Sequence, residues 1–359
     1  MAADLQPPIP GPIILFGSGE TSPSGQKIFN TIFSRMASGR PPNTPIQVAI
    51  LETPAGFELN SAQVAGRVGD FIAHRLQNYN PQVSLVPARR RGTPLSPDNP
   101  EILTPLLGAD LIFLGPGSPS YAVRQLQDSL AWHYLVARHR LGAGLALASA
   151  ATIAIGACAL PVYEIYKVGE EIHWKDGLDL LGAFGLPVVF VPHWNNTDGG
   201  EELDTSRCFM GRERFELLVN MLPRGQTVVG IDEKTGLSID FGTQQCTVIG
   251  RGSVTLMQSG HERHYTPGKV FDLQMLGDYQ SQEPGIGLPL GVWDSVLSHS
   301  NQFEKISSPS PQVIRLVKER ENARARRDWK DADNLRLEIL DLGWQIRDTP
   351  QGPVLEEIK

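Results

Sequence analysis

The sequence predicts an α/β fold with a mostly parallel β-sheet flanked by helices. Three observations predict it. Short apolar runs recur over the first two-thirds of the chain, segments with helical periodicity separate them, and glycine-rich turns follow two of the runs. Strands that alternate with helices are typical of a parallel sheet that is covered on both faces. In such a sheet the chemistry lies at the carboxyl ends of the strands, so these ends are where a site is expected.

Six apolar runs supply the expected strands, at 12–16, 46–51, 83–86, 111–114, 145–148 and 188–191. The first run ends in Gly17-Ser18-Gly19-Glu20, and the fourth ends in Gly115-Pro116-Gly117. Helical periodicity marks residues 59–78 and also 121–141, the latter as one or two helices. Short, wholly apolar runs fit strands that are buried on both faces.

After these runs the pattern changes to short β-rich pieces, which Gly236, Gly242 and Gly252 separate. This pattern predicts an antiparallel β extension of the same domain. Residues 278–311 are rich in Ser, Gly, Gln and Pro, as linkers are, and a strongly charged helical pattern follows at 312–340. We therefore place the large domain at 1–277, the linker at 278–305 and a small C-terminal helical domain at 306–359.

The composition excludes several classes of protein. The chain has 359 residues and a formal net charge of −7, which argues against a generally basic nucleic-acid binder but leaves room for a local basic patch. Cys158, Cys208 and Cys246 are too few and too scattered for a disulfide framework or a four-thiolate zinc site. We expect no metal and no organic cofactor. Glycine, serine and threonine interrupt the apolar stretch 141–160, and the first residues lack a signal-peptide pattern. We expect a cytoplasmic protein with no membrane segment.

Ser149 is the candidate nucleophile. It follows the apolar run 145–148, and Ala148, Ala150 and Ala151 surround it. A strained strand-to-helix turn that presents a nucleophile requires such small neighbours. The helix would direct its free N–H groups at the site, with Ala150 as an oxyanion donor. The alternative is that Ser149 only caps a buried helix, because the glycines of a Gly-x-Ser-x-Gly elbow are absent.

Other segments could complete a site for nucleophilic catalysis. Gly117, in the turn after the fourth run, would supply a second oxyanion N–H. His193 lies just beyond the last apolar run, at a strand end where a general base is expected, and the polar residues after it favour an exposed site over a structural histidine. Asp232 and Glu233 form an acidic turn between two β-rich pieces, which we interpret as a polar hairpin.

These motifs together resemble the family of dipeptidase E and cyanophycinase. The resemblance covers about residues 11–258 and depends on the order of the two glycine-rich turns, Ala148-Ser149-Ala150-Ala151, the segment from His193 and Gly-Ile-Asp-Glu-x-Thr at 230–235. Those proteins are serine peptidases on a class I glutamine amidotransferase-like scaffold. The resemblance implies that Ser149 is the nucleophile, that His193 is its base, and that the backbone amides of Gly117 and Ala150 form the oxyanion hole.

The family places the acid that orients the histidine between the serine and the histidine in the sequence. Glu164, Glu170 and Glu171 are the candidates, and we favour Glu164, although a salt bridge with Lys167 explains it equally well. The family's Ser-Ala-Gly turn is Ser-Ala-Ala here, and its paired glycines after the fourth strand are Gly-Pro-Gly. These departures leave a catalytically weak or inactive member as an alternative.

The family's substrates carry carboxylates. Dipeptidase E prefers peptides that begin with aspartate, and cyanophycinase cleaves β-linked Asp–Arg units. Arg207 and Arg212, with Arg214 nearby, could bind such a carboxylate, or they could be solvated on a helix face. The resemblance thus implies a serine hydrolase that acts on a small, Asp-containing peptide or amide. Members of the family are often homodimers, and nothing in the sequence decides this for the chain.

The segments 311–324, 327–336 and 342–352 together resemble the small C-terminal domain of cysteinyl-tRNA synthetase. The rest of the chain lacks the catalytic motifs of a synthetase. Residues 315–336 hold eight Arg and Lys against five Asp and Glu, so residues 306–359 could bind tRNA or could be a charged helix pair used for packing or dimerisation. The expected core residues are Ile314, Val317, Ala332, Leu335 and Ile339, with Gly343 as the helix C-cap.

Two functions therefore stay open, with a third that joins them. The favoured one is a Ser-His-acid hydrolase that cleaves a peptide or amide bond. The alternative is a catalytically inactive, amidotransferase-like ligand-binding protein whose C-terminal domain binds tRNA or a protein partner. The third is a hydrolase that acts on an aminoacyl or peptidyl ester carried by tRNA.

Overall fold

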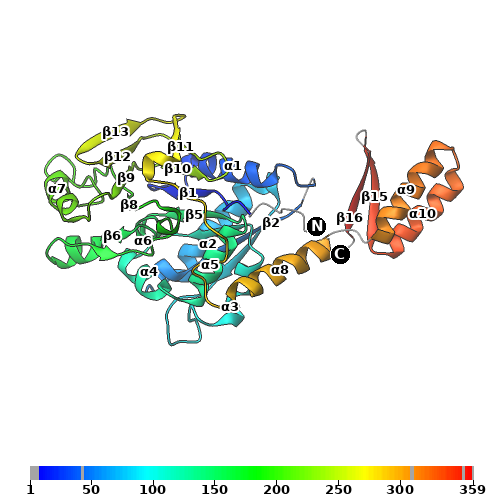
Figure 1. Ribbon diagram of the computed structural model, residues 1–359, viewed down its shortest axis with the longest axis horizontal. Helices are drawn as coiled ribbons and strands as arrows, with labels where there is room; N and C mark the ends of the chain where they lie inside the picture. The colour runs from blue at the N-terminus through cyan, green and yellow to red at the C-terminus, as the bar shows by residue number, and fades with distance from the viewer. Residues whose placement is uncertain (1–7, 42–43, 308–310, 350–351, 358–359) are drawn as a thin grey trace. The chain divides into compact units, whose positions relative to one another are not determined.

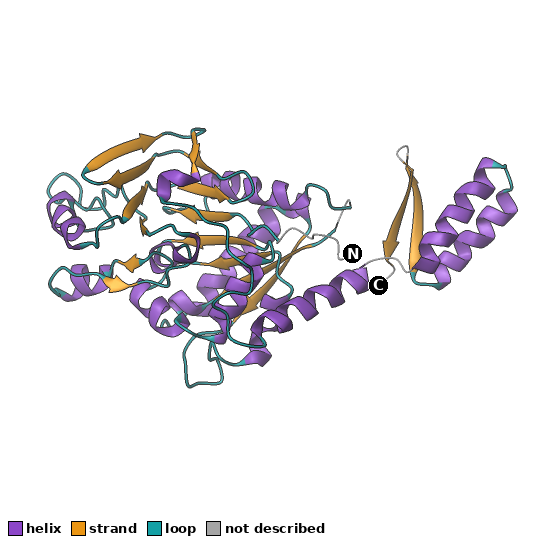
Figure 2. Cartoon of the chain, viewed as in Figure 1, coloured by secondary structure: helices purple, strands orange, loops and turns teal. Residues whose placement is uncertain are grey.

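The structure, a computed structural model, describes residues 8–41, 44–307, 311–349 and 352–357. The chain folds as two compact units, Met1–Val296 and Leu297–Lys359. Strands and helices alternate through the large unit, so the predicted α/β architecture is confirmed (Figure 2). None of the helices in the described ranges is long and apolar enough to cross a membrane.

An eight-stranded sheet forms the centre of the large unit, in the order β14-β11-β10-β1-β5-β4-β2-β3 (Figure 1). The five strands from β1 to β3 in this order are parallel, and five of the six predicted runs form them. The other three strands extend the sheet antiparallel beyond β1, as the sequence predicted. The eight strands of the sheet are β1 Ile13–Phe16, β2 Ile46–Leu51, β3 Pro81–Val86, β4 Leu111–Leu114, β5 Gly144–Ala148, β10 Thr235–Asp240, β11 Gln245–Gly250 and β14 Val270–Asp272.

The sixth predicted run, β8 (Val188–Val191), lies outside this sheet. It pairs in parallel with β9 (Thr227–Ile231), in a second sheet completed by β12 (Val254–Gln258) and β13 (His261–Tyr265). In the central sheet β1 pairs with β5 on one side and with β10 on the other, and β8 pairs with β9 instead. The carboxyl ends of β8 and β9 are therefore neighbours.

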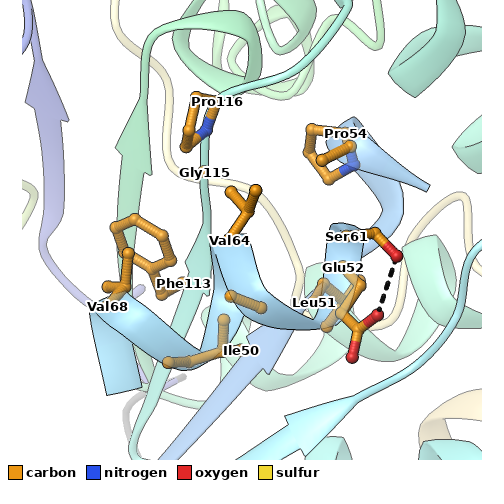
Figure 3. A pocket seen from close by; sticks show the side chains of 12 residues that line it. Ile50, Leu51, Glu52, Pro54, Ser61, Val64, Val68, Phe113, Gly115 and Pro116 are labelled. Atoms are coloured by element: carbon orange, nitrogen blue, oxygen red, sulfur yellow. Dashed lines mark hydrogen bonds between the residues drawn. The ribbon is translucent and has the colours of Figure 1, made fainter. Parts of the chain in front are cut away.

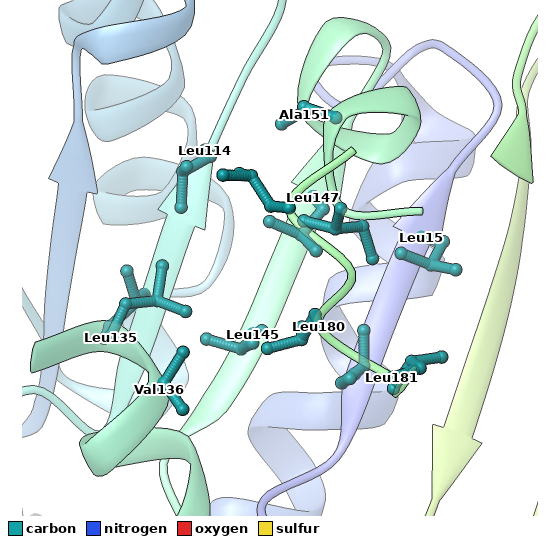
Figure 4. Packing of buried hydrophobic residues seen from close by; sticks show 14 of the residues in the cluster. Leu15, Leu114, Leu135, Val136, Leu145, Leu147, Ala151, Leu180 and Leu181 are labelled. Carbon is teal, nitrogen blue, oxygen red and sulfur yellow. The ribbon is translucent and has the colours of Figure 1, made fainter. Parts of the chain in front are cut away.

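Both faces of the central sheet are buried, as the wholly apolar strands require. Ile14 packs on one face with side chains of α1 (Pro23–Ala37) and α2 (Ser61–Arg75). Leu15 packs on the opposite face, in the same cluster as Leu147 (Figure 4). The other helices of the large unit are α3 Pro100–Leu107, α4 Pro119–Leu126, α5 Leu130–Arg140, α6 Ala150–Ala154 and α7 Arg212–Met221, and α8 is Val292–Ser307.

In two segments the structure adds to or differs from the secondary structure that the sequence predicted. The helical pattern at 121–141 is two helices, α4 and α5, because Ser129 begins α5 by accepting a hydrogen bond from the backbone N–H of Trp132. The segment expected as a linker, 278–305, contains most of α8. Val292 and Val296, one helical turn apart, are both buried, which gives this segment an apolar face that composition alone did not reveal.

The small unit contains α9 (Pro311–Ala325), α10 (Trp329–Asp341) and a hairpin of β15 (Trp344–Thr349) and β16 (Gly352–Glu357). Ala332, Leu335 and Ile339 lie in its core as expected, and Gly343 ends α10 with φ 84°. Ile314 is instead 57% exposed, because the buried face of α9 is set by Val313 and Leu316. The sequence Asp-Thr-Pro-Gln-Gly at 348–352 also predicts a turn, but it includes residues 350–351, which lie outside the described residues.

Candidate active site

Ser149 occupies the sharp turn between β5 and α6. Its backbone has φ 52° and ψ −111°, a conformation that costs an L-residue free energy and is typical of functional sites. Ala148, Ala150 and Ala151 are all buried, which leaves the turn no room for larger neighbours. The Ser149 side chain makes no capping hydrogen bond to α6, so the interpretation as a simple N-cap does not hold.

His193 lies beside Ser149, with its Nε2 3.0 Å from the serine Oγ. It follows β8, and its backbone also has a positive φ of 52°. The backbone N–H of His193 donates to the carbonyl of Gly17, which follows β1, and the backbone carbonyl of His193 accepts from the N–H of Cys208. These two hydrogen bonds hold the histidine at the strand ends, where the sequence placed a general base.

Glu233 completes the arrangement. Its Oε1 lies 3.0 Å from His193 Nδ1 and accepts a hydrogen bond of the same length from the Asn196 side chain. The backbone N–H of Glu233 donates to the Asn195 side chain at 2.8 Å, which fixes the turn. The hydrogen bond with His193 is the main reason why the pKa of Glu233 lies below its usual value. The carboxylate is therefore charged at neutral pH and can orient the imidazole.

The structure thus corrects the expected position of the acid. Glu164 lies in a π-helical turn (Glu164–Val168), and its Oε1 is 3.3 Å from the Lys175 amine rather than beside His193. Glu170 and Glu171 are exposed, and Glu170 lies 3.8 Å from His173. The salt-bridge partner of Glu164 is therefore Lys175 and not the expected Lys167.

The sequence pattern around Glu233 is typical of a polar hairpin, and it gave Glu233 no catalytic role. The signal that could have found it is topological. Because β8 and β9 are parallel neighbours, the residues that follow them, His193 and the turn with Asp232 and Glu233, meet at one edge. Asp232 accepts hydrogen bonds from the backbone N–H and the hydroxyl of Ser253, and so anchors this turn.

Two backbone amides could hold an oxyanion. Ala150 is the first residue of α6, and Gly117 has φ 146° in the turn before α4. Neither N–H donates to an acceptor anywhere in the described part of the chain. A Cβ at Gly117 would overlap the carbonyl oxygen of Pro54, which accepts from the N–H of Ser118 at 3.0 Å. Glycine is therefore required at this position by both space and backbone conformation.

A small pocket lies beside Gly115 and Pro116, the two residues that precede Gly117 (Figure 3). The buried Glu52 carboxylate lies in it, 2.6 Å from the Arg89 guanidinium and within hydrogen-bond distance of the Ser61 hydroxyl. The volume of the pocket is about 10 Å³, roughly the space of one water molecule, which is too small for a substrate. We therefore do not interpret it as the substrate site.

The two predicted carboxylate-binding arginines differ in their surroundings. The Arg207 guanidinium lies 3.9 Å above the Trp194 ring, next to His193 in the chain, and it makes no salt bridge with any described residue. Arg212 has an exposed side chain at the start of α7. Arg214 is used structurally, because it donates to the carbonyls of two preceding residues. No group of three or more metal-binding side chains occurs in the described ranges.

The crystal structure of a peptidase from an acI-B1 Actinobacterium is similar to this chain, with a TM-score of 0.58 and 22% sequence identity. The similarity covers 74% of this chain and 98% of that one. The large unit has the fold of that peptidase. At this sequence identity the likeness shows the fold alone. A putative peptidase E protein from Listeria monocytogenes EGD-e, 12% identical over 72% of this chain and 98% of that one, gives a TM-score of 0.41, which is too low to add to the argument.

The C-terminal segment has closer relatives. Residues 309–352 match the family model described as "Cysteinyl-tRNA ligase anticodon binding domain". A cysteine–tRNA ligase from Rubrobacter xylanophilus is 54% identical over 44 residues, which are 12% of this chain and 9% of that protein. The chain thus spans about a tenth of the length of the curated relatives it matches. The resemblance predicted for residues 311–355 is confirmed.

Proposed function

We propose that the large unit is a serine hydrolase that cleaves a peptide or amide bond. The observation that carries this proposal is the chain of contacts from Ser149 to His193 to Glu233, with both distances 3.0 Å. A serine hydroxyl needs an adjacent base to attack a carbonyl, and the base needs an acid to orient it. The Actinobacterium peptidase with the same fold supports the choice of bond.

The proposed reaction has two steps. Ser149 Oγ attacks the carbonyl carbon while its proton passes to His193 Nε2, and the N–H groups of Gly117 and Ala150 stabilise the oxyanion. The C–N bond then breaks, and His193 returns the proton to the leaving amine. In the second step water, deprotonated by His193, hydrolyses the acyl-enzyme and releases Ser149. Glu233 stabilises the imidazolium in both steps.

We propose a small, Asp-containing substrate, since Arg207 is the arginine best placed to bind its carboxylate. The guanidinium lies 3.9 Å from the Trp194 ring, and it donates to the Trp194 carbonyl, as the Arg207 backbone N–H also does. Glu262, Asp204 and Asp232 attract it electrostatically, but none of them lies within salt-bridge distance. Arg212 is a weaker candidate because its side chain is exposed. The proposed location of the protein is the cytoplasm.

A panel of Asp-X and β-Asp-Arg dipeptides tests this function, with wild type beside Ser149→Ala. The expected result is turnover by the wild type that the variant lacks. A serine-reactive fluorophosphonate should also label the wild type. If the wild type showed no turnover and was not labelled, the result would support the alternative of an inactive ligand-binding protein.

We propose tRNA binding as a second function, for residues 306–359, because of the family model that residues 309–352 match. Arg326, Arg327 and Lys330 surround the α9–α10 turn, beside Trp329, which is 58% exposed. Replacing these three basic residues with Gln in the full chain should weaken tRNA binding and reduce its salt dependence. Arg315→Gln, at the opposite end of α9, is the matched control. Equal binding by all variants would remove this turn from the proposal.

A further inference from the structure

The segment after β8 contains an unusual left-handed turn. Arg207, Cys208 and Phe209 have φ of 57°, 58° and 67°, three consecutive L-residues in a region that favours glycine. Such a conformation costs each L-residue free energy, because its Cβ comes too close to the following carbonyl oxygen. Backbone strain of this kind persists where the surrounding structure enforces it, and it concentrates at functional sites.

Several hydrogen bonds enforce the turn. The N–H of Phe209 donates to the Thr205 carbonyl at 2.9 Å, and the N–H of Gly211 donates to the Ser206 carbonyl at 2.8 Å. The Arg214 side chain donates to the carbonyls of Met210 and Phe209, at 2.7 and 3.1 Å. These contacts fix the direction of the Phe209 side chain.

The result is a line of aromatic rings that starts at the proposed catalytic base. The Phe209 ring centroid lies 6.1 Å from that of His193 and 5.2 Å from that of Tyr166, in the π-helical turn. Cys208 and Met210, on either side of Phe209, are buried in the core, whereas Phe209 and Tyr166 keep part of their surface exposed. The turn thus presents one aromatic side chain outward, next to the base.

We propose that Phe209 and Tyr166 form the subsite for the leaving group and select a large apolar or aromatic side chain there. This inference rests on the proposed hydrolase function. In a serine hydrolase the histidine protonates the leaving amine, so the residue released as the amine lies on the histidine's side of the nucleophile. The side chain of that residue would contact the two rings, which offer apolar area and edge-to-face stacking.

The test compares leaving groups with a constant acyl part. Asp-Phe and Asp-Ser differ only in the released residue, and the measured quantity is the ratio of their kcat/KM values. The wild type should prefer Asp-Phe by about tenfold or more, as a hydrophobic pocket discriminates. Phe209→Leu and Tyr166→Ala should lower this ratio to about threefold or less, and Tyr166→Phe should retain it.

Phe57→Ala is the matched control, because Phe57 is also a half-exposed aromatic residue but packs on Tyr121 of α4. It should leave the ratio unchanged. Thermal melting and fluorophosphonate labelling of each variant show whether it is folded with an assembled site. A ratio near one in the wild type, or a high ratio that survives Phe209→Leu in folded protein, overturns the proposal.

If neither dipeptide is cleaved, the acyl-enzyme formed from a p-nitrophenyl ester is partitioned between water, phenylalaninamide and serinamide. Preferential transfer to phenylalaninamide that Phe209→Leu removes supports the subsite, and equal transfer overturns it. Failure to form any acyl-enzyme or fluorophosphonate adduct means that the proposed hydrolase function is wrong, and this result also overturns the subsite. The two failures are therefore distinguishable.

Discussion

The two compact units reveal their relationships in different ways. Residues 309–352 match a family model, and a relative is 54% identical over 44 residues, yet the sequence of this segment contains neither histidine nor cysteine. The large unit is only 22% identical to a solved peptidase, yet it brings Ser149, His193 and Glu233 into contact. Sequence similarity is thus the stronger guide for the small unit, and geometry is the stronger guide for the large one.

The largest expected effect separates the two units. Ser149→Ala should lower kcat/KM for any cleaved substrate by about 10³-fold or more, because it removes the proposed nucleophile. It should leave tRNA binding by the full chain unchanged. Steady-state kinetics and a binding titration measure the two effects. Residual activity near the wild-type level would mean that Ser149 is not the nucleophile.

The next prediction compares two glutamates. Glu233→Gln should lower kcat by about 10²-fold or more, because the amide no longer stabilises the imidazolium. Glu164→Gln should change kcat by less than about threefold, because Glu164 lies against Lys175. The pair is matched in chemistry and differs only in position. The reverse order of effects would restore the acid that the sequence favoured.

Most of the fold follows from the sequence, because short apolar strands buried on both faces leave a clear pattern. Ser149 and His193 were predictable for the same reason, since each follows an apolar run at a strand end. Glu233 was not, because its role depends on β8 and β9 being parallel neighbours, which no local pattern encodes. The exposed position of Ile314 was not predicted either, since Val313, Leu316 and Ala323 form the buried face of α9 instead.

A smaller effect is expected at the oxyanion turn. Gly117→Ala should lower kcat by about 10²-fold, because the added Cβ overlaps the Pro54 carbonyl and displaces the N–H donor. Gly39→Ala is the control, since Gly39 also has a positive φ, of 81°, but has open space around it. Kinetics and melting temperature should be measured together. Equal kcat for both variants would exclude Gly117 as a donor.

The smallest expected effect is on stability. His139 is fully buried against the Phe184 and Phe241 rings, and burial lowers its pKa from 6.5 to about 4. In the unfolded chain the imidazole is protonated below about pH 6.5, whereas in the folded chain it is protonated only below about pH 4. The free energy of unfolding therefore decreases as the pH falls from 6.5 to 4. The loss from this group between pH 7.5 and pH 5 should be about 2 kcal/mol.

Urea unfolding at the two pH values, with wild type beside His139→Leu, measures this contribution as the difference between the two pH dependences. The leucine variant should lose less stability on acidification, because it has no imidazole to protonate. Identical pH dependences would show that His139 is charged or solvated in the folded protein.

The central claim is that Ser149 is activated by His193, and fluorophosphonate labelling tests it most directly. The full-length protein is treated with the probe and digested, and the modified peptide is identified by mass spectrometry. The account predicts one adduct, on Ser149, that is lost in His193→Ala while the melting temperature is retained. An unlabelled wild type, or labelling of Ser149 that is equally fast without His193, would contradict it.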